Sequence, residues 1–106
     1  MPTATIAANA SLSGAIDLNP SSLLAIAMPS AWTSASLTFQ SSYDGSTYFD
    51  VYNDAGDEYI IPVVASQFII LQRKDFLGLG YLKVRSGTTG TPVNQTSART
   101  IGLIIK

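Results

Sequence analysis

Hydrophobic residues in this chain alternate with polar ones over short stretches, and no long stretch places them at helical spacing. Alternation with a period of two is typical of strands that bury one face. Clusters of Gly, Pro, Asn, Asp and Ser, which favour tight turns, separate these stretches. The pattern predicts nine candidate strands, over 4–7, 13–17, 23–28, 35–42, 48–52, 59–62, 68–72, 81–86 and 99–106.

Many short strands separated by turns predict an all-β fold, an antiparallel β-sandwich of about eight strands. The length of 106 residues suits one domain and one core, so we expect a single β-sandwich domain over residues 1–106. Residues 1–13 carry no charge, although exposed edge strands are usually protected by charge. This segment could therefore be an extended N-terminal arm that pairs with the sheet edge of a neighbouring molecule.

Three hairpins are expected from the turn residues. Gly45 in the Asp-Gly pair can take the positive φ that a tight turn requires, and Gly56 can do so in the turn over 53–57. The third hairpin would join 81–86 to 99–106 through a wide loop. This loop, 87–96, contains two Gly and one Pro, so we expect it to be the most exposed and mobile segment.

Alternation also predicts the core. Trp32 is expected to cover one end of the core with its N–H bonded, an interpretation we prefer to ligand stacking. The remaining inward side chains are expected to be Leu24, Ile26, Met28, Leu37, Phe39, Phe49, Val51, Leu82, Val84, Ile101, Leu103 and Ile105.

The run over 63–71 is too apolar for a strand with one solvated face. It predicts either a strand buried on both faces or one whose outer face meets another subunit. Gly102, on the outer face of the last strand, would let a neighbour approach closely. Residues 77–80 could form a short helical turn. The candidate interface residues are Ile6, Trp32, Phe68, Ile70, Gly102 and Ile104.

The charge and side-chain inventory excludes several functions. The net charge is −1 with six basic residues, none of them in the first 72, which argues against nucleic acid as a partner. The chain has no Cys and no His, so thiolate chemistry and the commonest general base are missing. We therefore expect no enzymatic activity and no cofactor. Asp54, Asp57 and Glu58 form a weak calcium candidate, because their spacing matches no established calcium loop.

No stretch approaches the ~18 apolar residues that a membrane helix needs, so no membrane partner is expected. The first residues lack the basic and apolar regions of a signal peptide, and synthesis in the cytoplasm is expected. Charged residues make up only 12% of the chain, against about 25% in typical domains. Ser and Thr replace much of that charge, which suits broad contact with a protein or a sugar.

Two segments resemble small proteins encoded among the structural genes of tailed bacteriophages. The first runs from Met28-Pro29-Ser30-Ala31-Trp32-Thr33 through 37–45, and the second covers 81–87, 92–95 and 99–101. Such proteins are jelly-roll-like β-sandwiches that decorate or cement the capsid, often as dimers or trimers. The resemblance implies a virion protein on the capsid surface, made in the host cytoplasm, whose partners are the major capsid protein and copies of itself. It transfers no functional residue.

A second interpretation is a carbohydrate- or receptor-binding module of a tail fibre, baseplate or head spike. Sugar binding requires exposed aromatic side chains next to hydrogen-bonding groups. The candidates are Trp32 and the tyrosines Tyr43, Tyr48, Tyr52, Tyr59 and Tyr81. Alternation assigns about half of them to packing, so the signal is not specific.

Overall fold

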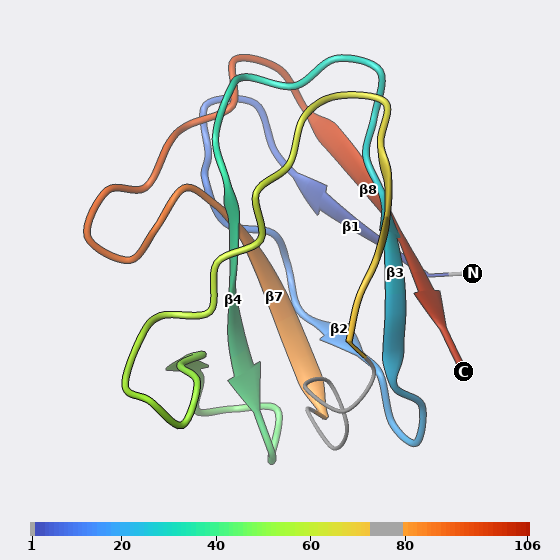
Figure 1. Cartoon of the computed structure of the whole chain (residues 1–106), viewed down its shortest axis with the longest axis vertical. Coiled ribbons are helices and arrows are strands. Elements are labelled where there is room, and N and C mark those ends of the chain that lie inside the picture. The colour runs from blue at the N-terminus through green and yellow to red at the C-terminus, as the bar shows by residue number, and fades with distance from the viewer. Residues whose placement is uncertain (1, 73–79) are drawn as a thin grey trace.

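Eight of the nine alternating stretches form strands, and these lie in two antiparallel four-stranded sheets that face each other (Figure 1). The computed structural model describes residues 2–72 and 80–106. Sheet A contains, in spatial order, β1 (Thr3–Ile6), β8 (Arg99–Ile105), β3 (Leu23–Ala27) and β6 (Phe68–Ile70). Sheet B contains β2 (Ile16–Asp17), β7 (Tyr81–Ser86), β4 (Leu37–Ser42) and β5 (Phe49–Asp50). The ninth candidate, 59–62, makes only an isolated bridge between Ile61 and Leu37.

The strands pair in a nested way. β1 pairs with β8, β2 with β7, β3 with β6 and β4 with β5. The same strands would pair if the whole chain were folded back once as a single long hairpin. In this fold, however, successive pairs belong to alternate sheets. This nested pairing is the connectivity of a jelly roll. The predicted β-sandwich is confirmed, and its strand order agrees with the jelly-roll form that the resemblance implies.

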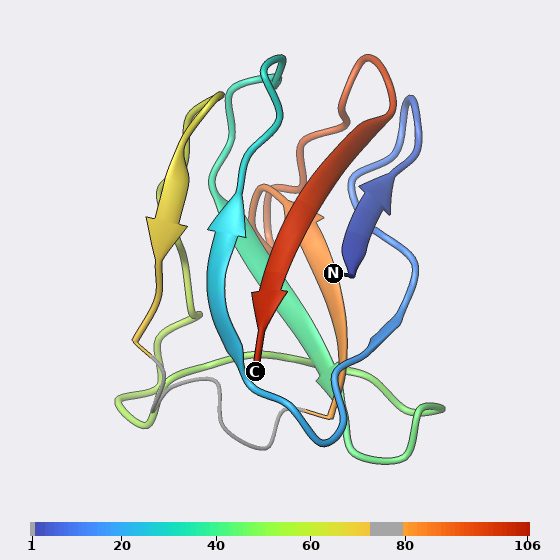
Figure 2. The ribbon, with the colours of Figure 1, turned by 90° about the vertical axis from the view of Figure 1, so that its right-hand side faces the viewer.

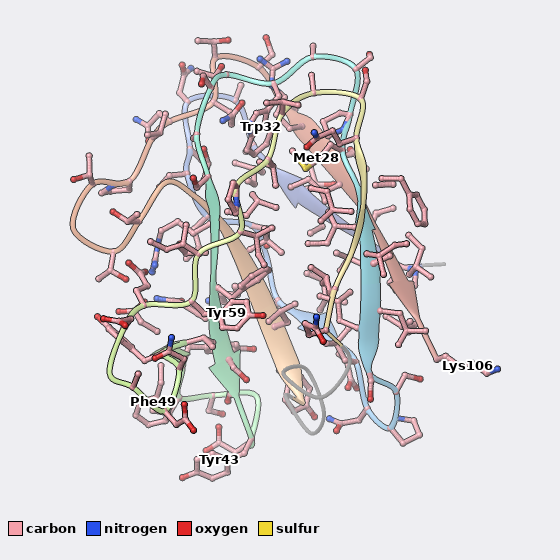
Figure 3. All side chains as sticks on the ribbon, in the orientation of Figure 1. Met28, Trp32, Tyr43, Phe49, Tyr59 and Lys106 are labelled. Atoms are coloured by element: carbon pink, nitrogen blue, oxygen red, sulfur yellow. The ribbon has the colours of Figure 1, made fainter. Side chains whose placement is uncertain are left out.

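The core fills the space between the sheets and contains aliphatic side chains from both. Phe39 on β4 is its largest fully buried side chain. Trp32 packs against this core and its Nε1–H donates to the carbonyl oxygen of Ala35 at 3.0 Å. Trp32 and Met28 lie at the upper end of the molecule in Figure 3, where Trp32 covers the end of the core as predicted. The other large side chains of the core that are fully buried are Ile6, Leu18, Leu23, Ile26, Leu37, Leu82, Val84, Ile101 and Leu103.

Two of the predicted inward positions are wrong. A register shift between Leu23 and Ala25 interrupts the alternation of β3, so Leu23 is buried and Leu24 only half-buried. Such a bulge places two successive residues opposite one on the partner strand, which simple alternation does not foresee. Phe49 lies on the short edge strand β5 and is 56% exposed, because no strand beyond it covers the ring.

The hairpins at Gly45 and Gly56 are confirmed, with positive φ at both glycines. The third hairpin is wrong, because β7 and β8 belong to different sheets and their connection crosses between these sheets. The connection is also not exposed throughout. Gln95 in this connection is completely buried, while the turn around Gly90 in the same connection is exposed.

The N-terminal segment pairs within its own chain. Residues 3–6 form β1, which is bonded to β8 along its whole length rather than extended as an arm. The run 63–71 is not buried on both faces, since Phe68 and Ile70 are exposed. Residues 77–79 of the expected helical turn lie outside the described residues. Within 2–72 and 80–106 there is no helix, and so none that could span a membrane.

Candidate functional site

Charged side chains are unevenly distributed between the two sheets. The parts of the chain that the structure describes contain ten charged residues, and eight of them belong to sheet B or to the turns at its ends. The other two, Arg99 and Lys106, lie at opposite ends of β8 in sheet A. The two outer faces of the sandwich therefore differ in chemistry.

The outer face of sheet B is polar and is partly covered by its own turns. Arg85 on β7 is buried, and its Nη2 contacts Asp50 Oδ1 at 2.6 Å. Its Nη1 lies 3.4 Å from Glu58 Oε2 and donates to Thr89 Oγ1 at 2.8 Å. Thr38 Oγ1 lies 3.4 Å from the same Nη1. The guanidinium thus ties two turns to the sheet through bonds from both Nη1 and Nη2.

Hydrogen bonds hold two of the acidic side chains of sheet B in their charged form. The hydrogen bond from Arg85 is the main reason that the pKa of Asp50 lies below 3.8. Backbone N–H groups of Thr47 and Ser46, followed by the hydroxyl of Ser42, lower the pKa of Asp44. Both carboxylates therefore stabilise local structure.

The three acids proposed as a calcium site do not come together. Glu58 accepts hydrogen bonds from Thr89 at 2.6 Å and 3.0 Å, and so turns toward Arg85. Asp54 and Asp57 are exposed on the turn. Throughout residues 2–72 and 80–106, no three His, Cys, Asp or Glu side chains are grouped so that they could hold a metal ion. The turn is held by Asn53, whose Oδ1 accepts the N–H groups of Ala55 and Asp57.

A second polar network lies at the end of the sandwich. Gln95 is completely buried, and its Nε2 donates to the Thr33 carbonyl at 3.0 Å and to Ser86 Oγ at 2.7 Å. Its Oε1 accepts from the Thr33 N–H at 2.8 Å and from Arg99 Nε at 3.1 Å. The side chain thereby joins two loops and two strands. Every bond is internal, so we assign Gln95 a structural role.

The outer face of sheet A is different, and the register of its strands shows how it is assembled. Ala25 on β3 lies between Ile70 on β6 and Ile104 on β8, and these paired residues share one face. In the next row Ala27 lies between Phe68 and Gly102. The second row continues to Thr3 on β1, and a third row pairs Thr100 with Thr5. Figure 2 shows these four strands side by side at the front of the molecule.

We call these outward residues the apolar face: Thr3, Thr5, Ala25, Ala27, Phe68, Ile70, Thr100, Gly102 and Ile104. The face contains no charged residue. Phe68 is 63% exposed and Ile70 is 82% exposed, and both lie on the edge strand β6. Small residues fill the centre of the face, where Ala25 is buried and Ala27 and Gly102 are half-buried.

Four of the six interface candidates lie together on this face: Phe68, Ile70, Gly102 and Ile104. Ile6 does not, because its side chain is fully buried in the core. Trp32 is half-buried at the end of the sandwich, away from the apolar face. Sequence reasoning missed Ala25 and Ala27, because alternation alone cannot show that β3 lies between β6 and β8.

Exposed aromatic side chains form a smaller feature near β5. Tyr43 is 81% exposed, Phe49 56% and Tyr52 52%. Figure 3 shows Tyr43 and Phe49 at the lower end of sheet B, far from Trp32. The ring of Tyr48 is covered by Lys83, whose Nζ lies 4.3 Å from the ring centroid. Trp32 thus lies at the opposite end of the molecule from Tyr43 and Phe49, while Tyr59 packs against the core between them.

Comparison with known proteins adds no identification: no family model, no curated protein and no solved structure matches this chain.

Proposed function

We propose that this chain is a decoration, or cement, protein of a tailed-bacteriophage capsid. In this proposal it binds the outer capsid surface through the apolar face and stabilises the head by bridging subunits of the major capsid protein. It also contacts copies of itself, and its location is the capsid surface of the virion. The phage setting rests on the sequence resemblance. The use of sheet A rests on one observation, the segregation of charge that leaves a broad uncharged face.

The physical argument concerns the cost of removing water. Burying a charged side chain without a partner is costly, whereas burying apolar area is favourable by about 25 cal/mol per Å². The apolar face contains no charge, and two of its largest side chains, Phe68 and Ile70, remain exposed. Stable association buries about 1,200–2,000 Å² in total. Simultaneous contact with shell subunits and other copies would supply such an area.

The test uses capsids prepared without the protein, to which purified protein is added back. Ile104→Arg places a charge on the apolar face, on the inner strand β8, and Thr47→Arg places the same charge on an exposed turn of sheet B. We expect Ile104→Arg to bind at least ~100-fold more weakly than wild type, because the guanidinium would be buried unpaired. Thr47→Arg should bind like wild type. Circular dichroism of both variants would verify that each one is folded.

Capsid stability provides the second measurement. Capsids carrying the wild-type protein should release their DNA at a higher temperature than bare capsids. Equal release temperatures would contradict the cement role. Binding of Ile104→Arg with wild-type affinity would contradict the use of the apolar face.

The exposed aromatics near β5 favour a second candidate, a carbohydrate- or receptor-binding module of a fibre, baseplate or spike. Tyr43, Phe49 and Tyr52 could stack on sugar rings beside the hydroxyl-rich turn over 44–47. A glycan array with the isolated domain distinguishes the two candidates. Binding that is lost in Tyr43→Ala, with the apolar face intact, would support this alternative over the cement role.

A further inference from the structure

The edge strand β6 combines exposed apolar side chains with an unprotected main chain. Sheet A ends at β6 in the described part of the chain. Residues 63–72 contain no charged side chain and no proline, although charge and proline are the usual protection of an edge. The edges of sheet B differ, since β2 and β5 are only two residues long and include Asp17 and Asp50. The β6 edge is therefore more open to pairing than either edge of sheet B.

The main-chain polar groups of β6 alternate in direction. The Gln67 carbonyl accepts the Met28 N–H at 2.8 Å, and the Leu71 N–H donates to the Leu24 carbonyl at 2.9 Å. Odd-numbered residues of this segment therefore direct their polar groups toward β3. In an antiparallel strand the intervening residues direct theirs away from that partner. The N–H and C=O groups of Phe68 and Ile70 consequently lie along the outer edge.

We propose that two copies of this chain associate through their β6 strands, antiparallel and about a two-fold axis at Ile69. In this register Phe68 lies opposite Ile70 of the partner subunit, and Ile70 lies opposite Phe68 of the partner subunit. Their outward main-chain groups then bond in pairs. The two sheets A become one continuous sheet.

The same register also places compatible side chains opposite each other. Phe68 and Ile70 both belong to the outer face, so each pair brings an aromatic ring against a β-branched side chain, a favourable cross-strand combination. The edge is uncharged, so a two-fold contact brings no like charges together. Pairing through β5 would instead bring Asp50 close to its own copy. The other edge of sheet A, β1, presents the hydroxyl side chains of Thr3 and Thr5, which water solvates well.

The size of the contact sets the expected affinity. Phe68 and Ile70 from both copies can bury at most roughly 500 Å² of apolar area, below the ~1,200 Å² of a standard stable interface. The dimer should therefore be reversible, with a dissociation constant between about 1 µM and 1 mM. This inference concerns association of the free protein and does not depend on the proposed capsid role. The dimer would leave most of the apolar face of both copies on the same side of the combined sheet.

Sedimentation of the full chain at loads across that range is the first test. The wild type should change from 11.2 kDa to twice that mass as its concentration rises. Ile70→Lys places a charge on the edge and should weaken association at least ~10-fold. Thr5→Lys, at the opposite edge of the same sheet, is the matched control and should associate like wild type. Ile70 is 82% exposed, so its replacement should leave the fold intact.

Crosslinking tests the register, because the chain has no cysteine of its own. Directly paired residues have Cα atoms about 5.5 Å apart, within reach of a disulfide. The double variant Phe68→Cys with Ile70→Cys should form a disulfide-linked dimer. Either single variant should not, since its two cysteines would lie diagonally across the axis, more than ~7 Å apart.

A wild type that stays at 11.2 kDa at every load would overturn the inference, as would Ile70→Lys associating like wild type. Equal crosslinking of the single and double variants would overturn the register. A monomeric chain that still binds capsids would refute the dimer and leave the proposed function standing. A dimer that fails to bind capsids would support this inference and contradict the proposed function.

Discussion

Replacement of Gln95 by leucine should strongly destabilise the fold. The side chain is completely buried and makes four hydrogen bonds, to Thr33 N–H, Thr33 C=O, Ser86 Oγ and Arg99 Nε. Leucine has a similar volume, so Gln95→Leu removes these bonds without opening a large cavity. The groups that bonded to Gln95 would remain, and some of them would be buried without partners.

The magnitude follows from the bonds. Three neutral hydrogen bonds contribute about 1 kcal/mol each and the bond from Arg99 about 2 kcal/mol. Apolar burial of the leucine offsets part of this loss, so the free energy of unfolding should fall by about 3–5 kcal/mol. A domain of this length has a stability of roughly 5–15 kcal/mol. The substitution would therefore remove a large fraction of the total.

Urea denaturation measures the change. Fluorescence of Trp32, the single tryptophan, and far-UV circular dichroism should give coincident transitions if unfolding is two-state. With an m-value of about 1.5 kcal/mol per M, the midpoint should fall by about 2–3 M in Gln95→Leu.

The neighbouring Asn94 is exposed, and Asn94→Ala serves as the control that should change the midpoint little. A shift below about 0.5 M in Gln95→Leu would refute this reasoning. It would mean that water or a relaxed loop replaces the four bonds, and that the network does not hold the end of the sandwich together.

Two further predictions concern sheet B and the connection after it. The pKa of Asp50 lies below its ordinary value of 3.8 because of Arg85, so its stabilising effect is present above that pH and is lost as the pH falls through the lowered value. Asp50→Asn should thus reduce the free energy of unfolding at pH 7 by about 1–2 kcal/mol, and this free energy should fall less steeply below about pH 4 than in the wild type. An equally steep fall in the variant would contradict the role of this pair. Gly87 has φ +90°, and a Cβ there would lie 2.5 Å from the Thr91 carbonyl oxygen. Gly87→Ala should therefore cost about 2–3 kcal/mol in thermal or urea unfolding, while Gly90→Ala, with open space around it, should stay within about 0.5 kcal/mol, and equal effects would contradict this explanation.

Local patterns in the sequence were enough to predict the fold class and most strand positions. Alternation identified β7 over Tyr81–Ser86 with its correct bounds, and the inward direction of Leu82 and Val84. The turns at Gly45 and Gly56 were also predictable, because φ and the hairpin geometry depend on a few adjacent residues. In each case the determining interactions lie within a few positions along the chain.

The tertiary structure alone decided which strands are neighbours. Consecutive strands β7 and β8 look like a hairpin in the sequence, yet they lie in opposite sheets. Each sheet is assembled by pairing segments that are distant in the chain, such as β1 with β8. The burial of Gln95 has the same origin, because Thr33 lies 62 positions away in the chain.

The apolar face shows most clearly which features the sequence determines and which ones the tertiary structure decides. Phe68, Ile70, Gly102 and Ile104 could be named from composition and alternation, since each is apolar or small on an outward position. Their union with Ala25 and Ala27 into one face required β3 to lie between β6 and β8. Strand order is set by the total burial of the folded chain rather than by any local pattern. For this protein the sequence therefore determines the kind of surface, and the fold determines where that surface is assembled.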